Sequence, residues 1–437
     1  DGAVNNDVFG LASNGTNGGQ TGVSPISLDA IEQFQVQVAP FDVKISGFAG
    51  GAISAITKSG TNEFEGSAYY LNRNEGFAGK TPPSLVAAGG SREKLAEFNA
   101  STIGVRAAGA IKKDKLFYFI NYEKQDNETP QPFDVNNYTG NVKNLTSSAS
   151  VVDGLEFLKN NLFTRFGYNP GAYTNNLATL KSDKIIAKID WNINDNHKLS
   201  LRHSLVKAND VSPSRSSANS INFMAGAIDF KTTTNSTALE LNSRFGNKFS
   251  NNLVIGYTTV EDDRNPFGSP FPNVEIVDGS GRIYLGSEAF STANYLKQNT
   301  LTVTDNFEIN AGKHTITVGT HNEFSSSKNV FFGRNFGYYR FSNVNDFINN
   351  AKPNRFRLGY SLVGGDGDNS QGAAEFDVMQ FGGYIQDEFR VANNLKLTFG
   401  LRADVPVWDN YINNEDFNTR TIPLLEAAGK DLQGASV

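Results

Sequence analysis

The sequence predicts an all-β fold, a transmembrane antiparallel up-and-down β-barrel preceded by part of a small α+β domain. Apolar and polar residues alternate in runs of about nine to thirteen residues, which is the length of a tilted membrane-crossing strand. The strands of a soluble β-sandwich average only about five or six residues. Short and long connections between these runs alternate along the chain. Charged residues recur on the polar face of most runs. These features fit a membrane barrel, in which one face of each strand meets lipid and the other meets water.

The composition suits strands and polar loops and excludes several classes of protein. Of the 437 residues, 19% are charged and 11% are aromatic, and 42 are glycine, so the balance suits helices poorly. A net charge of −6 argues against a nucleic-acid partner, because the chain has no excess of Lys and Arg side chains to replace the counterions around phosphates. The sequence contains no cysteine, so a disulfide or a thiolate metal site is impossible, and the four histidines never share metal-ligand spacing.

The first segment, residues 1–62, is rich in Gly and Asn and predicts the C-terminal part of a small mixed domain. The stretch "SLDAIEQF", with Ser27 as N-cap, predicts one short helical turn, and "FQVQVA" and "GAISAITK" predict strands. No basic or apolar leader follows Asp1, so we expect the natural N-terminus to lie further upstream. No run reaches the roughly 18 to 20 apolar residues of a membrane-spanning helix.

Residues 63–437 predict the N-terminal half of the barrel. The clearest alternation places Ile185, Ile189 and Trp191 on one face and Lys188 and Asp190 on the other. The same pattern predicts about eleven strands in all. They are Phe64–Asn72, Thr102–Ile111, Lys115–Lys124, Lys184–Ile193, Lys198–Lys207, Ser236–Phe245, Asn252–Glu261, Asn299–Ile309, His314–Ser325, Phe376–Val391 and Leu395–Val407.

The connections predict which ends of the strands lie together. Tight turns are expected at Lys113, Asp195, Asn247, Ala311 and Asn393, and the long connections are 125–183, 208–235, 262–298 and 326–375. In an up-and-down sheet, all tight turns then lie at one end and all long loops at the other, as in outer-membrane barrels. Bacterial single-chain barrels have an even number of strands, so an odd count predicts a segment of a longer barrel.

A soluble β-sandwich is the competing all-β interpretation, with the apolar faces inward and no rule for loop length. The strict segregation of charge favours the barrel, because a central Lys or Arg that faced lipid would cost about 2–4 kcal/mol. Two acids break the pattern: Asp305 and Asp387 lie in the apolar register of their strands. A β-bulge could turn either side chain inward, and Asp387 could instead lie near the aqueous rim of the barrel.

Four stretches carry a family resemblance: "DGAVNNDVFGLA", "PISLDAIEQFQV", "SGFAGGAISAITKSGTNEFEGSAYYLNRN" and "GYIQDEFRVANNLKLTFGLRADVPVW". They resemble TonB-dependent outer-membrane receptors, in particular the Oar-like branch common in Bacteroidota, and the resemblance covers essentially the whole chain. It implies that residues 1–62 are the later part of a plug domain, and that the barrel has about 22 strands. It also implies location in the outer membrane of a Gram-negative, Bacteroidota-type cell.

The resemblance implies a transporter that takes up a solute, a peptide, glycan or chelate, past the plug. Its expected partners are the TonB-ExbB-ExbD energy-coupling system, outer-membrane lipid, and surface lipoproteins or envelope complexes. No TonB box is visible in the sequence, so energy coupling rests on the resemblance alone. The alternative function is a scaffold, adhesin or subunit of an envelope assembly or secretion complex whose plug never opens.

The stretch "KSGTN" predicts the plug-to-barrel junction, a turn formed by Lys58, Ser59, Gly60, Thr61 and Asn62. Polar residues that face the lumen of the barrel are predicted to hold the plug by hydrogen bonds. They are Lys188, Asp190, Arg202, Glu240 and Arg244.

Other candidate sites are few, and we expect neither enzymatic activity nor a cofactor, because no catalytic motif occurs. The most aromatic loop could bind a ligand by stacking, through Phe331, Phe332, Phe336, Tyr338, Tyr339 and Phe341. A self-packed loop or an interfacial aromatic girdle is the favoured interpretation of the same residues. Asp366 and Asp368 have a spacing that sometimes binds calcium, but the EF-hand pattern fails at Gln371, and a plain loop is favoured.

Overall fold

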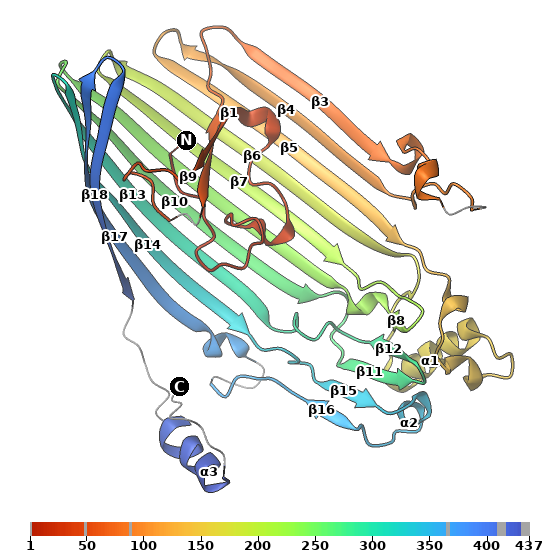
Figure 1. Cartoon of the computed structure of the whole chain (residues 1–437). Helices are drawn as coiled ribbons and strands as arrows, with labels where there is room; N and C mark the ends of the chain where they lie inside the picture. Colours follow the sequence, from red (N-terminus) through yellow and green to blue (C-terminus); the bar gives the residue numbers. More distant parts are fainter. Residues whose placement is uncertain (1, 48–49, 87–89, 364–367, 409–416, 430–437) are drawn as a thin grey trace.

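A curved sheet of eleven antiparallel strands dominates the computed structural model, which describes residues 2–47, 50–86, 90–363, 368–408 and 417–429 (Figure 1). Neighbouring strands follow the chain, apart from the short strands inside the long loops. In spatial order the strands are β3 (Glu65–Asn74), β4 (Asn99–Lys112), β5 (Leu116–Gln131), β6 (Asn176–Asn194), β7 (His197–Ser212), β9 (Ile228–Phe245), β10 (Phe249–Pro266), β13 (Asn294–Ala311), β14 (His314–Phe331), β17 (Ala374–Ala392) and β18 (Leu395–Trp408).

This sheet confirms the predicted all-β fold and all eleven predicted strands. The tight turns lie at one end of the sheet, here called the turn end, and the long connections lie at the other, the loop end. The predicted bounds hold to within three residues at the turn end, where β10 begins at Phe249 and not at Asn252, but most are too short at the loop end. Strand β9, for example, begins eight residues before Ser236, because Thr232, Thr233 and Thr234 continue the strand as β-branched residues.

The two faces of the sheet are inverted relative to a soluble protein. In β6, Ile185 and Ile189 are 40% and 43% exposed, whereas Lys184 and Lys188 are 4% and 7% exposed. A water-soluble sheet would bury the isoleucines, so this arrangement fits a strand whose outer face meets lipid. Within the described residues, no helix is long and apolar enough to cross a bilayer.

Asp305 and Asp387 remain on the outer face, so the predicted inward turn at a β-bulge is wrong. Their strands keep regular registers at both positions. Each carboxylate instead has a partner on the same face: Asn251 Nδ2 donates to Asp305 over 2.8 Å, and Asp387 lies 2.8 Å from His314 Nδ1. Asp305 lies six residues before the end of β13 at Ala311, and Asp387 lies five residues before the end of β17 at Ala392, both toward the turn end, where the outer face approaches the aqueous rim.

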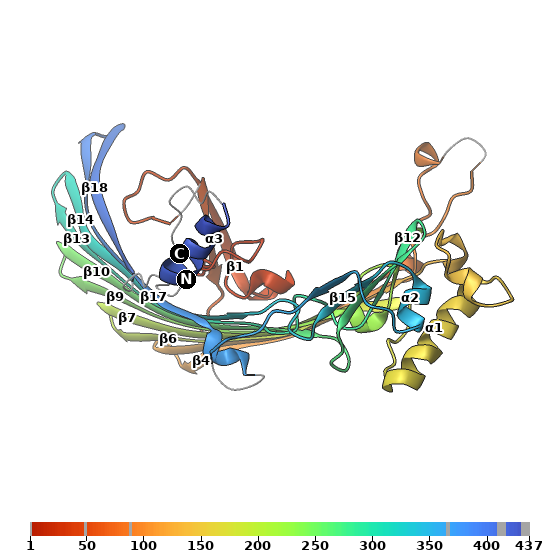
Figure 2. The same cartoon turned by 90° about the horizontal axis from the view of Figure 1, so that it is seen from below.

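The N-terminal segment lies on the concave side of the sheet (Figure 2). We call residues 2–62 the plug segment and the concave face of the sheet the wall. The plug segment contains a hairpin of β1 (Ile31–Val38) and β2 (Gly51–Thr57). The expected helical turn is only the 3₁₀ turn Leu28–Ala30, because the chain enters β1 at Ile31 and buries Ser27 against the wall.

The long loops fold together into a second domain at the loop end, which we call the cap (Figure 1). Its five strands come from three different loops: β8 (Ser220–Asn222), β11 (Asn273–Asp278), β12 (Gly281–Leu285), β15 (Tyr338–Phe341) and β16 (Arg355–Arg357). Strands β11 and β15 pair in parallel, as do β12 and β8, so the sheet joins segments that are distant in the sequence. Two α-helices complete the cap, α1 (Val151–Phe166) and α2 (Val344–Ile348).

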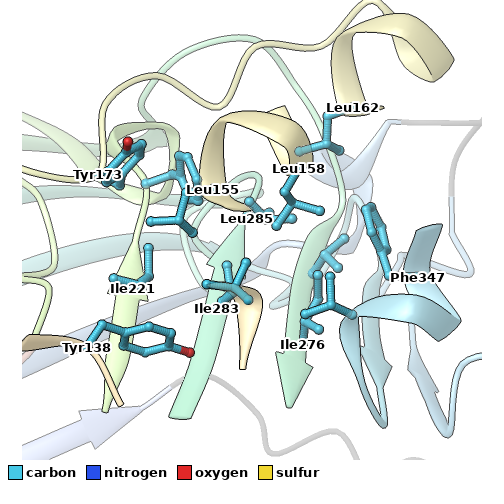
Figure 3. Close-up of a cluster of buried hydrophobic side chains, with 14 of the residues drawn as sticks. Tyr138, Leu155, Leu158, Leu162, Tyr173, Ile221, Ile276, Ile283, Leu285 and Phe347 are labelled. Atoms are coloured by element: carbon cyan, nitrogen blue, oxygen red, sulfur yellow. The ribbon is translucent and has the colours of Figure 1, made fainter. Parts of the chain in front are cut away.

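The cap has its own hydrophobic core, shown in Figure 3. Leu155, Leu158 and Leu162 of α1 are fully buried and point toward Ile276 and Ile283 of the sheet. At the edge of this core, Asp278 accepts a hydrogen bond from the Val142 amide over 2.9 Å. Burial nevertheless raises the pKa of the Asp278 carboxyl above its ordinary value.

The shared core predicts that the four loops open as one unit. Replacing Ile283 in β12 by Val removes one buried methylene and is expected to cost about 1 kcal/mol. Amide hydrogen exchange should then accelerate roughly fivefold in α1 and β15, which belong to other loops. Ile111→Val near the turn end of β4, where Ile111 is 59% exposed and distant from the cap, is the matched control and should leave exchange in the cap unchanged. Acceleration confined to β12 would contradict a single cooperative cap.

Short elements complete the described chain. The remaining 3₁₀ turns are Gly19–Thr21, Glu75–Phe77, Pro83–Leu85, Val135–Asn137, Val142–Leu145, Met224–Gly226 and Asn369–Gly372, and after β18 come a π-helical turn, Phe417–Thr421, and the helix α3, Ile422–Ala427.

Candidate functional site

The interface between the plug segment and the wall contains a group of buried polar contacts. At its centre, Glu123 of β5 accepts hydrogen bonds from Lys184 Nζ over 2.8 Å and from the Tyr69 hydroxyl over 2.5 Å. The Ser27 hydroxyl of the plug segment donates to the same carboxylate over 3.0 Å. Glu123 and Lys184 are 7% and 4% exposed, so their charges are balanced largely by each other.

A second carboxylate reaches the wall from the plug segment. Asp29 lies 3.1 Å from Arg106 Nε on β4 and accepts a hydrogen bond from the Ser67 hydroxyl of β3 over 2.8 Å. Lys58 Nζ lies 3.5 Å from the other oxygen of Asp29. The 3₁₀ turn at Leu28–Ala30 places Ser27 and Asp29 on the same side, so both side chains reach neighbouring wall strands.

The five predicted junction residues follow the inner surface of the β4–β5 hairpin. Lys188 Nζ of β6 donates to the Ser59 hydroxyl over 3.0 Å and to the Thr57 carbonyl over 3.4 Å. At the turn, Asn62 and Asp114 exchange two hydrogen bonds, of 2.6 and 2.8 Å. These contacts attach the end of the plug segment to the wall at the turn end.

Gly60 lies between these two attachments, where no side chain fits. A Cβ atom at this position would lie 2.5 Å from the carbonyl oxygens of both Gly109 and Tyr118. Beside it, the Thr61 hydroxyl donates to the Glu63 carbonyl over 3.1 Å. The sequence "KSGTN" therefore combines a close backbone approach with side chains that form local hydrogen bonds.

Contacts on the opposite side of the plug segment are also mainly polar. Val43 donates its amide to Gln386 of β17 over 3.2 Å and accepts from Arg402 Nη1 of β18 over 2.9 Å. Gln20 donates to Asp262 of β10 over 2.5 Å. Apolar packing is limited to small clusters, such as Val23 against Val206 and Ala208. The plug segment thus contacts strands along almost the whole width of the wall.

The lumen-facing charges predicted from the sequence have different roles in the structure. Lys188 contacts the plug segment as expected, and Asp190 lies 3.8 Å from its ammonium group. Glu240 instead accepts hydrogen bonds from two amides of the wall, those of Asn242 and Asn252. Arg202 and Arg244 line two separate cavities beside the plug segment.

The structure places the aromatic loop mainly within the cap. Phe341 belongs to the cap core, Tyr339 packs against that core, and the Tyr338 hydroxyl donates to Glu275 over 2.6 Å. Phe331 is 52% exposed and stacks on Phe290 with a centroid distance of 6.5 Å, while Phe332 and Phe336 are half-buried. Self-packing therefore explains Tyr338, Tyr339 and Phe341, and a ligand role for the exposed rings stays a prediction.

The calcium candidate receives no support from the described part of the chain. Asp366 lies outside the described residues, and Asp368 caps a 3₁₀ turn by accepting hydrogen bonds from the Ser370 amide and hydroxyl. Among the described residues, no cluster of three or more His, Asp and Glu side chains could hold a metal ion.

Sequence reasoning missed the residues at the centre of the interface. Glu123 and Lys184 could be assigned to the polar face of their strands, but their pairing with each other and with Ser27 depends on the register between β5 and β6. Asp29 was visible only as an acid in a helical turn.

The chain was compared with protein families and with known proteins. Residues 56–152 and 136–434 match the family described as "Outer membrane beta barrel domain". The TonB-dependent transporter Oar of Myxococcus xanthus is 23% identical over 227 residues, which cover 45% of this chain and 19% of that protein.

Two solved structures show the same fold. The outer membrane transporter YddB of Escherichia coli superposes with a TM-score of 0.57 at 12% identity, over 87% of this chain and 44% of that one. The ferric enterobactin receptor PfeA of Pseudomonas aeruginosa gives a TM-score of 0.50 at 14% identity, over 88% and 46%. The chain spans less than half the length of each of these relatives. Since the family match covers most of the chain, the protein belongs to the outer membrane β-barrel family.

Proposed function

We propose that the protein is a TonB-dependent outer-membrane transporter, with residues 1–62 as the later part of its plug and residues 63–437 as the N-terminal half of its barrel. In the described part of the chain β3 and β18 form the edges of the sheet, and in a barrel further strands would pair with both, because unpaired strand edges are not stable in lipid. The turn end would face the periplasm, and the cap would face the cell exterior. The names of the similar proteins support the transport role.

The observation that carries the proposal is the polar character of the plug–wall interface. Hydrogen bonds and ion pairs attach the plug segment at Ser27, Asp29 and Val43, while the buried apolar clusters that join it to the wall hold only a few residues. Interfaces of this kind permit relative movement, because water can replace polar contacts at low cost once they separate. A plug that TonB-derived force displaces needs such an interface.

A reversible crosslink tests whether the plug must move. An ideal Cβ at Gly256 of β10 lies 3.4 Å from the Cβ of Ala3, near the Cβ separation of a disulfide, about 3.5–4.5 Å. Ala3→Cys with Gly256→Cys in the full-length protein should therefore tie the plug segment to the wall. Thr302→Ala accompanies both changes in every arm, because Thr302 Oγ1 lies 2.6 Å from the added Cβ.

The measurement compares which solutes cells remove from a rich medium. The crosslinked strain, a strain without the protein and a strain without TonB should leave the same solutes unconsumed, and a reductant should restore uptake only in the crosslinked strain. Each single-cysteine variant is the control and should behave as the parent. If the crosslinked and TonB-free strains consumed every solute that the parent consumes, while the deletion strain showed an envelope defect, the scaffold or adhesin alternative would replace this proposal.

A further inference from the structure

One edge of the cap sheet is open. The strand order is β16-β15-β11-β12-β8, so β16 lies at the margin of the sheet, and in the described chain it pairs only with β15 (Figure 1). All three residues of β16, Arg355, Phe356 and Arg357, are exposed. An edge strand presents backbone donors and acceptors with which a further strand can pair. The cap therefore offers a template for one more strand at β16.

A row of exposed apolar side chains continues from this edge, in residues 355–362, which we call the edge segment. Phe356, Leu358, Tyr360 and Leu362 occupy every second position and are 54%, 47%, 56% and 87% exposed. A group of large apolar side chains that stays in water gives up the free energy of burial. Contiguous apolar surface of this kind marks a site of interaction. The edge segment is therefore a docking surface in search of its occupant.

Hydrogen bonds from one side hold the backbone of the edge segment in place. The Gly359 carbonyl accepts from Asn335 Nδ2 over 2.9 Å, and the Ser361 amide donates to Asn369 Oδ1 over 3.2 Å. A Cβ atom at Gly359 would clash with the Gly333 carbonyl oxygen, so the two backbones lie in close contact. A partner would thus bind a segment that is already ordered, which lowers the entropic cost of binding.

The charges of residues 351–363 are all positive. Lys352, Arg355 and Arg357 are exposed, and none of the three forms an ion pair within the described part of the chain. Residues 351–363 contain no acid, although the whole chain has 45 acids against 39 bases. The edge segment is thus a basic strip on an acidic protein, and a complementary partner carries Asp or Glu side chains.

The same charges and the shape of the edge select among the possible occupants. Two copies paired at this edge would bring their arginines together, and like charges on neighbouring strands repel, so charge disfavours a second copy. A small solute is held in a concave site, and neither cavity beside the plug segment is lined by the edge segment. A sheet edge instead suits a strand of another protein, which pairs through its main chain.

We propose that the cap binds a partner protein at the cell surface by adding an extended, acidic segment of that partner to the sheet at β16. Because Arg355 and Arg357 alternate with Phe356 and Leu358, one face of the added strand is acidic and the other is apolar. The main chain of the segment pairs with β16. This inference depends on the function proposed above only for the orientation of the cap toward the cell exterior.

A fluorescent peptide of alternating Glu and Val tests this recognition on the purified full-length protein, with binding measured by anisotropy. A peptide of alternating Lys and Val tests the charge, and the Glu-Val peptide N-methylated at every residue tests strand pairing, because it has no amide donor. We expect only the unmethylated acidic peptide to bind. Arg355→Gln with Arg357→Gln should weaken it roughly tenfold. Arg215→Gln, an exposed residue beside β8 at the opposite edge of the cap, is the matched control and should change nothing.

A photoreactive residue identifies the occupant in intact cells. The full-length protein carries p-benzoylphenylalanine in place of Phe356, and the crosslinked segment is mapped by mass spectrometry. We expect a segment of a different envelope protein with alternating acidic and apolar residues, and we expect its capture to disappear when Arg355 and Arg357 are both replaced by Gln. The same photoreactive residue in place of Phe163, which is 62% exposed on α1, is the control and should not capture that segment.

Five results would overturn the inference. Failure of the acidic peptide to bind better than the basic peptide excludes recognition by charge, and equal binding of the N-methylated peptide excludes strand addition. A crosslink within the same chain, or between two copies, shows that the protein itself covers the edge. TonB-dependent depletion of the acidic peptide by cells makes the segment a solute and not part of a partner. The binding and crosslinking results do not involve plug movement, so they are distinct from failure of the transport proposal.

Discussion

Replacing Lys184 by Met is expected to reduce the free energy of unfolding by about 3–5 kcal/mol, because it leaves the buried Glu123 carboxylate without a cation. The pair lies 2.8 Å apart and both residues are almost fully buried. The Tyr69 and Ser27 hydroxyls would still donate to Glu123, but hydroxyl groups do not replace a full charge. The measurement is the midpoint of urea unfolding of the purified full-length protein, together with the protection of the plug segment from trypsin.

The double variant Glu123→Leu with Lys184→Met separates the charge effect from lost packing. Removing both partners abolishes the unpaired charge, so the stability of the double variant should return to within about 1 kcal/mol of the parent. Ser27 would lose its acceptor on the wall, and the plug segment should therefore remain more sensitive to trypsin even in the double variant. A single variant as stable as the parent would show that water already reaches this pair.

The barrel wall was predictable because lipid and water impose a period of two on each strand. Ile185, Ile189 and Trp191 could be assigned to one face without any knowledge of their neighbours, and the structure exposes all three. The same rule failed for the loop-end bounds of the strands, where both faces leave the membrane and polar β-branched residues continue the pairing.

The cap could not be predicted, because its strands are short and pair across different loops. Strand β12 has five residues and β8 has three, and their parallel pairing joins Ile283 to Ile221 across more than one barrel strand. No local periodicity distinguishes such segments from irregular loops. The helix α1 carried a regular pattern of buried leucines, but the surface that these leucines cover comes from other loops.

The contacts of the plug segment were equally hidden from the sequence. Lys188 was assigned to the lumen face, and the structure places it against Ser59 and Thr57. Alternation places Glu123 on the same face of its strand as Asn121, and nothing in the sequence showed that Glu123 contacts the plug segment whereas Asn121 donates to the Val105 carbonyl. The difference arises from the position of the plug segment on the wall, a tertiary feature that alternation does not encode.

Replacing Leu201 by Arg is expected to cost about 2–4 kcal/mol and to reduce the amount of assembled barrel in the outer membrane. Leu201 lies on the outer face of β7, opposite Ile189 of β6, and is 41% exposed. In a membrane barrel this exposure means contact with lipid, where a guanidinium is poorly solvated. The measurement is the fraction of full-length protein that migrates as a heat-modifiable band in membrane extracts.

Ser200→Arg is the matched control, because Ser200 lies one residue away at the same depth but faces the lumen. Its neighbour across the β6–β7 ladder is Asp190, which offers a counter-charge to the new guanidinium. Assembly of this variant should therefore stay near the level of the parent. A soluble β-protein would give the reverse order, since Arg on an exposed surface is harmless whereas Arg in the interior is not. The two neighbouring substitutions thus decide which face of the sheet meets lipid, and with it whether the concave face is the lumen that the plug segment closes.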